Sequence, residues 1–152
     1  MTLGFWFARS FSGKQLLPYV VSQCAGAILA SMTLSFLFVH PTLGATIPSG
    51  GASQSFVLEI ILTFFLMFVI LNVATDAKEK GLMAGVAVGA IVALDALFGG
   101  PVSGASMNPA RSLAPALISG HLESLWIYLT APVIGSSLAV LVCKYLVRHN
   151  AP

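Results

Sequence analysis

The residues most able to do chemistry lie in one broken stretch, Gly-Gly-Pro-Val-Ser-Gly-Ala-Ser-Met-Asn-Pro-Ala-Arg-Ser-Leu at residues 99–113. Asn108 is a favourable helix N-cap, and Pro109 fits the first helical position, where its missing N–H is tolerated. With its carbonyl oxygen used as the cap, the Asn108 amide still has two N–H donors. The helix N-terminus adds partial positive charge at the same place. Asn108 is therefore expected to donate hydrogen bonds to the oxygen of a small neutral molecule.

Arg111 lies in the first turn of the same predicted helix, where the helix dipole disfavours a cation. A cation is also energetically unfavourable at membrane depth. Its presence against both effects predicts a role, which is to repel cations and protons while donating hydrogen bonds to a neutral solute. Taken alone, Asn108-Pro109 would be interpreted as an ordinary turn or helix start. Arg111, the surrounding Gly and Ser residues and the membrane topology favour the functional interpretation.

The composition indicates an integral membrane protein. The 152-residue chain is 57% hydrophobic and 8% charged, and several apolar runs are long enough to cross a bilayer, unlike those of a soluble helical core. Cys24 and Cys143 lie inside apolar runs, so we expect buried reduced thiols rather than a disulfide or a metal site. Neither a cofactor nor a nucleic-acid partner is expected.

Four full membrane spans are predicted, at residues 15–39, 56–75, 82–98 and 125–146, after a short apolar stub at 2–8. Two spans carry small residues at helical spacing, which predicts close helix packing. These are Ser22, Gly26 and Ala30 in the first span and Gly85 and Gly89 in the third.

The segment at 108–118 is too short to be a fifth span. A helix over these residues would rise about 16 Å at ~1.5 Å per residue, whereas a bilayer core is about 30 Å thick. We therefore predict a re-entrant half-helix, preceded by irregular backbone from residue 99. Irregular backbone at this depth must be buried in protein or line a wet cavity. Half-helices that meet near the midplane are typical of membrane passages.

The basic residues support this topology. All Lys and Arg residues except Arg111 fall at 9–14, 78–80 and 144–148, which share one side of the membrane in the re-entrant arrangement. The opposite loops, 40–55 and 119–124, contain none. The positive-inside rule therefore predicts that the basic loops and the C-terminus are cytoplasmic.

The chain also contains an internal repeat. Residues 17–30 align with residues 126–139, with Tyr, Gly, Leu and Ala in register. The two spans run in opposite directions, which is typical of an inverted repeat. The counterpart of Asn108-Pro109-Ala110 would lie just before Met1, so we expect the chain to be the C-terminal part of a longer protein.

Residues 103–112, Ser-Gly-Ala-Ser-Met-Asn-Pro-Ala-Arg-Ser, resemble the second signature loop of the major intrinsic proteins, the aquaporins and aquaglyceroporins. The resemblance implies one all-α membrane domain over 1–152, an inverted-repeat bundle that lacks the first two spans and the first Asn-Pro-Ala motif. A set of smaller matches resembles the nodulin-26-like branch. It comprises Ala96, Ala105, Ser112, Ala116, Tyr128 and Leu129.

The resemblance also implies a function and its residues. The family forms passive channels for water and small neutral solutes, here glycerol-like molecules and uncharged metalloid hydroxides, that exclude ions and protons and assemble as homotetramers. Asn108, Pro109 and Ala110 match the pore motif, and Arg111, Ala96 and Ala105 match three of the four selectivity-filter residues. Glu59 matches a buried carboxylate that braces the signature loop.

Other functions remain as alternatives. A non-conducting membrane fragment is the main one, because half of the pore wall is absent. An intramembrane enzyme would need converging acid, base, nucleophile or metal groups, which the sequence does not offer. Asp95 is expected to make a structural hydrogen bond, with a proton-relay role as its alternative.

Overall fold

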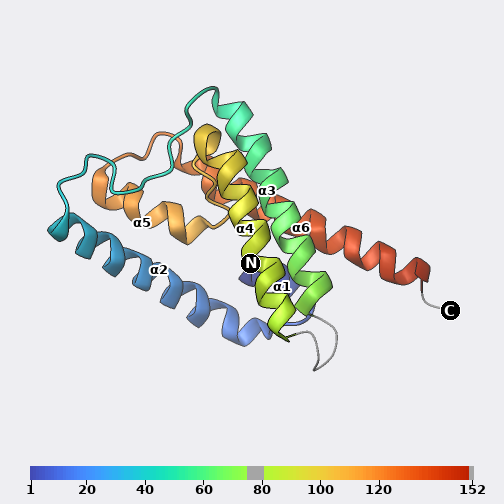
Figure 1. The fold of residues 1–152 in the computed structure, drawn as a ribbon. Coiled ribbons are helices and arrows are strands. Elements are labelled where there is room, and N and C mark those ends of the chain that lie inside the picture. The colour runs from blue at the N-terminus through green and yellow to red at the C-terminus, as the bar shows by residue number, and fades with distance from the viewer. Residues whose placement is uncertain (75–80, 151–152) are drawn as a thin grey trace.

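Six helices make up the part of the chain that the computed structural model describes, which is residues 1–74 and 81–150, with side chains at 1–73 and 83–146. Figure 1 shows their arrangement. They are α1 (Thr2–Phe7), α2 (Gly13–Leu37), α3 (Ala52–Ala74), α4 (Gly81–Ser103), α5 (Pro109–Ser119) and α6 (Leu125–Asn150). The predicted basic loop at 78–80 and the side chain of Arg148 lie outside the described residues.

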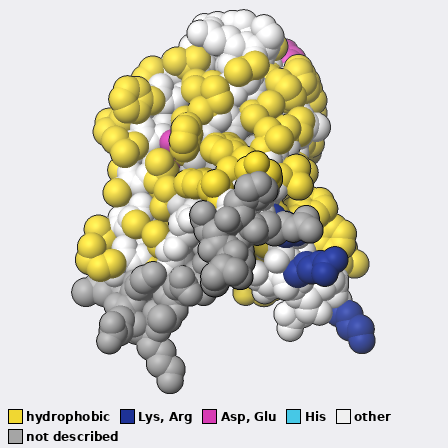
Figure 2. All heavy atoms as spheres, turned by 90° about the vertical axis from the view of Figure 1, so that its right-hand side faces the viewer, with side chains coloured by type: hydrophobic (Ala, Val, Ile, Leu, Met, Phe, Trp, Pro, Cys, Tyr) yellow, Lys and Arg dark blue, Asp and Glu magenta, His cyan; other side chains and the backbone are white. Residues whose placement is uncertain are grey.

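Four of these helices are long and apolar enough to cross a membrane, namely α2, α3, α4 and α6. The predicted all-α class with four spans is therefore confirmed. α5 has only 11 residues, and α1 has 6, so neither can span. Hydrophobic side chains cover most of the face in Figure 2, and Lys and Arg side chains gather at one end of it.

α4 extends further than the sequence predicts. The irregular backbone was expected to begin at residue 99, but the helix continues through Gly-Gly-Pro to Ser103. Its last carbonyl groups bond to distant hydroxyl groups. Ser49 Oγ donates to the Pro101 carbonyl at 2.8 Å, and Tyr128 Oη donates to the Ser103 carbonyl at 2.6 Å. Gly104, at φ +85°, then ends the helix in a conformation that favours glycine.

The closest helix contact joins α3 and α6. A Cβ atom at Gly135 would lie 2.3 Å from the Ile60 carbonyl oxygen and 3.0 Å from the Phe64 nitrogen. Only glycine therefore permits this approach, in the manner of small residues at membrane helix interfaces. Beside it, Met67 of α3 packs against Ala139 of α6, and both are fully buried.

The predicted small-residue stripes do not pack against described residues. A Cβ atom at Gly26, Gly85 or Gly89 would have no atom within 4 Å. The prediction of close packing there is wrong for the described chain, because these positions face outward from α2 and α4. Both helices also expose most of their apolar side chains.

Candidate functional site

The site is built on the N-terminus of α5. Asn108 is its N-cap, with φ −150° and ψ 115°, and its Oδ1 atom accepts a hydrogen bond from the Ala110 N–H at 3.1 Å. Pro109 occupies the first helical position, as the sequence predicts. The Asn108 Nδ2 group donates to no described residue, so both of its N–H bonds remain available. At the other end, Gly120 closes α5 in the left-handed conformation, at φ +83°.

The loop before α5 is conformationally strained, and a buried carboxylate accepts hydrogen bonds from it. Ala105 and Met107 have φ values of +44° and +52°, which L-residues rarely adopt. Glu59 of α3 is fully buried. Its Oε1 atom accepts from Ser103 Oγ at 2.7 Å and from the Ser106 N–H at 2.8 Å, while Oε2 accepts from the Met107 N–H at 2.9 Å. Such over-determination allows strained backbone to persist at a functional site.

Arg111 lies in the first turn of α5 and contacts the loop between α2 and α3. Its Nη1 atom donates to the Gly44 carbonyl at 2.7 Å. A neutral carbonyl orients the guanidinium group but does not neutralise it. The positive charge therefore remains effective in the surrounding space.

Two cavities meet at Asn108. The first has a volume of about 260 Å³ and lies between α1, α2, α5 and α6. The second, of about 430 Å³, lies between α2, α5 and the loop between α2 and α3, whose Gly44 carbonyl accepts from Arg111. Asn108, Ala110 and Gln23 line both cavities. The two cavities therefore adjoin at these three residues, and the Asn108 amide is one of the groups between them.

Gln23 was missed by the sequence analysis. It lies on α2, opposite α5, and its Nε2 atom donates to Thr2 Oγ1 at 2.9 Å. The available signal was a polar amide in the middle of an apolar span, which at membrane depth commonly marks a functional position.

Of the other predicted pore residues, Pro109 lines the first cavity, and Arg111 lines the second. The two predicted filter alanines do not join them. Ala96 is exposed on α4, and Ala105 packs against a cluster that contains Leu62. Neither alanine lines these two cavities. Their role in a filter therefore stays a prediction.

Asp95 is buried, but its Oδ2 atom has no hydrogen-bond partner in the part of the chain that the structure describes. The predicted structural hydrogen bond of Asp95 therefore stays a prediction. Leu62 and Leu66 of α3 form the adjacent apolar cluster with Val88 and Ile91 of α4, and leucine side chains offer no donor.

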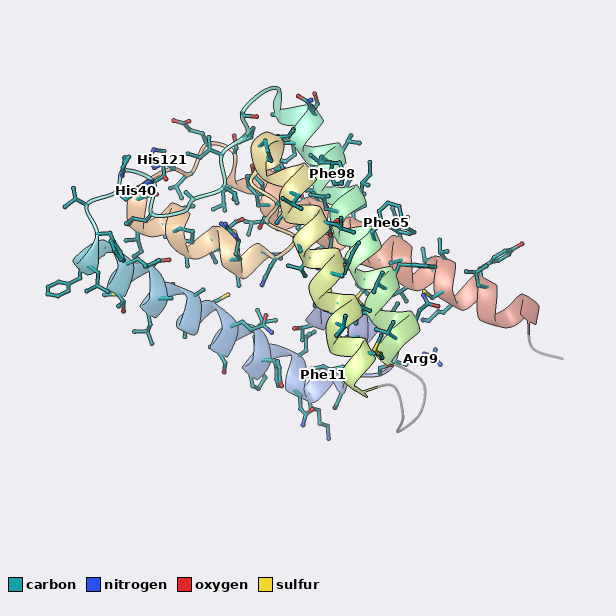
Figure 3. All side chains as sticks on the ribbon, viewed as in Figure 1. Arg9, Phe11, His40, Phe65, Phe98 and His121 are labelled. Carbon is teal, nitrogen blue, oxygen red and sulfur yellow. The ribbon has the colours of Figure 1, made fainter. Side chains whose placement is uncertain are left out.

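The described cysteine and histidine side chains are not grouped as metal ligands. Cys24 and Cys143 are free thiols, and both are half-buried rather than buried. His40 and His121 lie at the opposite end of the bundle from Arg9 (Figure 3). Within the described ranges, no three His, Cys, Asp or Glu side chains gather as a metal site would require.

Comparisons with known proteins give one consistent result. The family model described as "Major intrinsic protein" matches residues 1–143. Nodulin-26 from Glycine max is 51% identical over 138 residues, which cover 90% of this chain and 51% of that protein. Aquaporin NIP1-1 from Zea mays is also 51% identical, over 90% of this chain and 49% of its own. The chain thus spans about half the length of these relatives.

The aquaglyceroporin from Plasmodium falciparum has a similar solved structure. The TM-score is 0.84 at 24% identity, over 96% of this chain and 70% of that one. At this identity the likeness concerns the fold alone.

Proposed function

The chain belongs to the major intrinsic protein family, and from this premise we propose that it forms the wall of a passive membrane channel for water and small neutral solutes. The observation that carries the proposal is that Asn108 lines both cavities and that its Nδ2 group donates to none of the described residues. No chemical reaction is proposed, because the family consists of channels. The conducting form is proposed to be a homotetramer of full-length subunits.

The chemistry of the junction supports passage of a neutral molecule. A water molecule beside Asn108 would turn its oxygen toward the amide donors and toward the partial positive charge of the α5 N-terminus. Its own O–H bonds would then point away in both directions, which interrupts a continuous hydrogen-bonded wire for protons. Arg111, in the wall of the second cavity, would repel cations that approach the junction.

The solute range is proposed to include glycerol-sized molecules and uncharged metalloid hydroxides. Water-selective members of the family generally have a His at the position that Ala96 matches. Ala96 and Ala105 would offer only methyl groups, and Arg111 would supply fixed donors on one side. Such a partly apolar ring suits a solute with hydroxyl groups on one side and carbon on the other.

Uptake by vesicles that carry the full-length protein tests this proposal. We expect passage of water and glycerol without proton leak, and we expect Ala96→His to reduce glycerol uptake severalfold while water passage persists. Ala93→His, on an exposed position one turn away, is the matched control. If the unmodified vesicles pass water but no glycerol, the wide filter is wrong. If they pass neither, the proposed channel is wrong.

The orientation in the membrane is a separate proposal. Arg9, Lys78 and Arg148 are proposed to face the cytoplasm, with Ser49 and Glu123 outside, because of the positive-inside distribution. In sealed cells, an impermeant thiol reagent is expected to label Ser49→Cys and Glu123→Cys in a variant without Cys24 and Cys143. Labelling of Arg148→Cys from outside would contradict the re-entrant topology.

A further inference from the structure

Three buried hydroxyl side chains form a hydrogen-bonded chain beside the N-terminus of α5. Thr46 Oγ1 lies 2.6 Å from Ser112 Oγ, Ser112 Oγ bonds to Ser106 Oγ, and Ser106 Oγ donates to the Asn108 backbone carbonyl at 3.0 Å. Their exposed fractions are 8% for Thr46, 5% for Ser106 and 0% for Ser112. The chain thus connects the loop between α2 and α3 to the signature loop and to α5.

The direction of this chain follows from the proton count. Each hydroxyl group has one O–H bond to donate. Ser106 uses its proton on the Asn108 carbonyl, so it must accept from Ser112. Ser112 has then used its own proton, so Thr46 must donate to it. Thr46 is therefore the donor to Ser112, and connected bonds of this kind reinforce one another.

The segment that carries Thr46 also contacts the signature loop and α5 at two further points. The Gly44 carbonyl accepts from Arg111, the residue next to Ser112. Gly104, at φ +85°, lies so close to Thr46 that a Cβ atom there would be 3.0 Å from Thr46 Cγ2. Residues 44–46 thus contact both the loop before Asn108 and the first turns of the helix after it.

We propose that Thr46 is a positioning residue, which fixes Asn108 and the first turn of α5 through the chain Thr46–Ser112–Ser106. The functional consequence rests on the proposed channel, since it is there that Asn108 and Arg111 contact the solute. Ser112 makes no other side-chain hydrogen bond among the described residues, so loss of the Thr46 hydroxyl leaves a buried acceptor unsatisfied. The strained backbone at 105–107 then depends more heavily on its hydrogen bonds to Glu59.

Three variants separate positioning from general stability. Thr46→Val keeps the shape of the side chain and removes the donor. Thr46→Ser keeps the donor and should restore the wild-type behaviour. Thr42→Val is the matched control, because Thr42 lies in the same loop and, among the described residues, its hydroxyl bonds only to His40, at 3.3 Å.

Backbone amide hydrogen exchange of the segment 104–112 is the first measurement. We expect Thr46→Val to accelerate exchange there about fivefold, the usual effect of losing one hydrogen bond, while Thr46→Ser and Thr42→Val remain near the wild type. The inference is overturned if Thr46→Val leaves exchange in 104–112 unchanged, if Thr42→Val accelerates it equally, or if Thr46→Ser fails to restore it.

The second measurement is the ratio of glycerol to water permeability in vesicles. Thr46→Val should change this ratio, whereas a variant with fewer folded molecules would lower both rates equally and leave the ratio unchanged. Vesicles of unmodified protein that conduct nothing would count against the proposed channel, and the exchange measurement would still decide the role of Thr46. An unchanged ratio in conducting vesicles would contradict the positioning of the pore residues.

Discussion

Replacing Glu59 with Gln is expected to abolish permeation and to lower the free energy of unfolding by about 3 kcal/mol, since hydrogen bonds to charged groups contribute about 1.5–3 kcal/mol each. The carboxylate accepts three hydrogen bonds, from Ser103, Ser106 and Met107. A glutamine side chain has one acceptor oxygen and one NH₂ group, so at least one buried N–H or O–H donor would face another donor. The loop at 104–107 would then leave its strained conformation, and Asn108 would move with it.

Thermal unfolding in detergent and osmotic swelling of vesicles measure the two effects of Glu59→Gln. Glu123→Gln is the matched control, because it makes the same chemical change on an exposed loop residue. Glu59→Asp provides a second comparison, since it keeps the charge but shortens the reach to the loop. Wild-type permeability per folded molecule in Glu59→Gln would show that the loop needs no carboxylate.

The parts of the fold that depend on local chemistry could be predicted from the sequence. The four spans follow from runs of apolar residues, and the half-helix follows from its length and its Asn108-Pro109 start. Its end follows from Gly120, which takes the left-handed conformation that few other residues adopt. Each signal lies within a few residues of the feature that it predicts.

The end of α4 could not be predicted in the same way. Gly99-Gly100-Pro101 is a helix-breaking sequence by local propensity. The helix persists because Ser49 and Tyr128, both remote in sequence, bond to its final carbonyl groups. Local propensity gives the free-energy cost of placing these residues in a helix, but it contains no information on distant partners.

The hydroxyl chain is a second feature that local reasoning misses. Thr46 belongs to a loop rich in Gly, Ser, Thr and Pro, and nothing in its neighbourhood distinguishes it from Thr42. Its importance arises from Ser112, which lies 66 residues away. Gln23 is similar, because its place at the junction of the cavities depends on how α2 packs beside α5.

Replacing Arg111 with Ala is expected to make the proposed channel leak protons and cations. The guanidinium group lines the second cavity, and its only hydrogen bond among the described residues is to the neutral Gly44 carbonyl. A unit charge about 6 Å away opposes a passing cation by about 3 kcal/mol at an effective dielectric constant of about 20, or roughly 100-fold in its local concentration. Removing the charge should therefore raise proton conductance strongly and reduce water passage little.

The conservative variant Arg111→Lys separates charge from geometry. Lysine keeps the positive charge but lacks the planar group of donors that binds the Gly44 carbonyl and faces the solute at the same time. We expect Arg111→Lys to exclude protons and to pass glycerol more slowly, whereas Arg111→Ala should leak protons and pass glycerol at least as fast. A pH-sensitive dye trapped in the vesicles, read beside glycerol uptake, measures both. If Arg111→Ala vesicles remain proton-tight, the barrier lies at Asn108 and the α5 N-terminus, where oriented donors and the helix dipole act without Arg111.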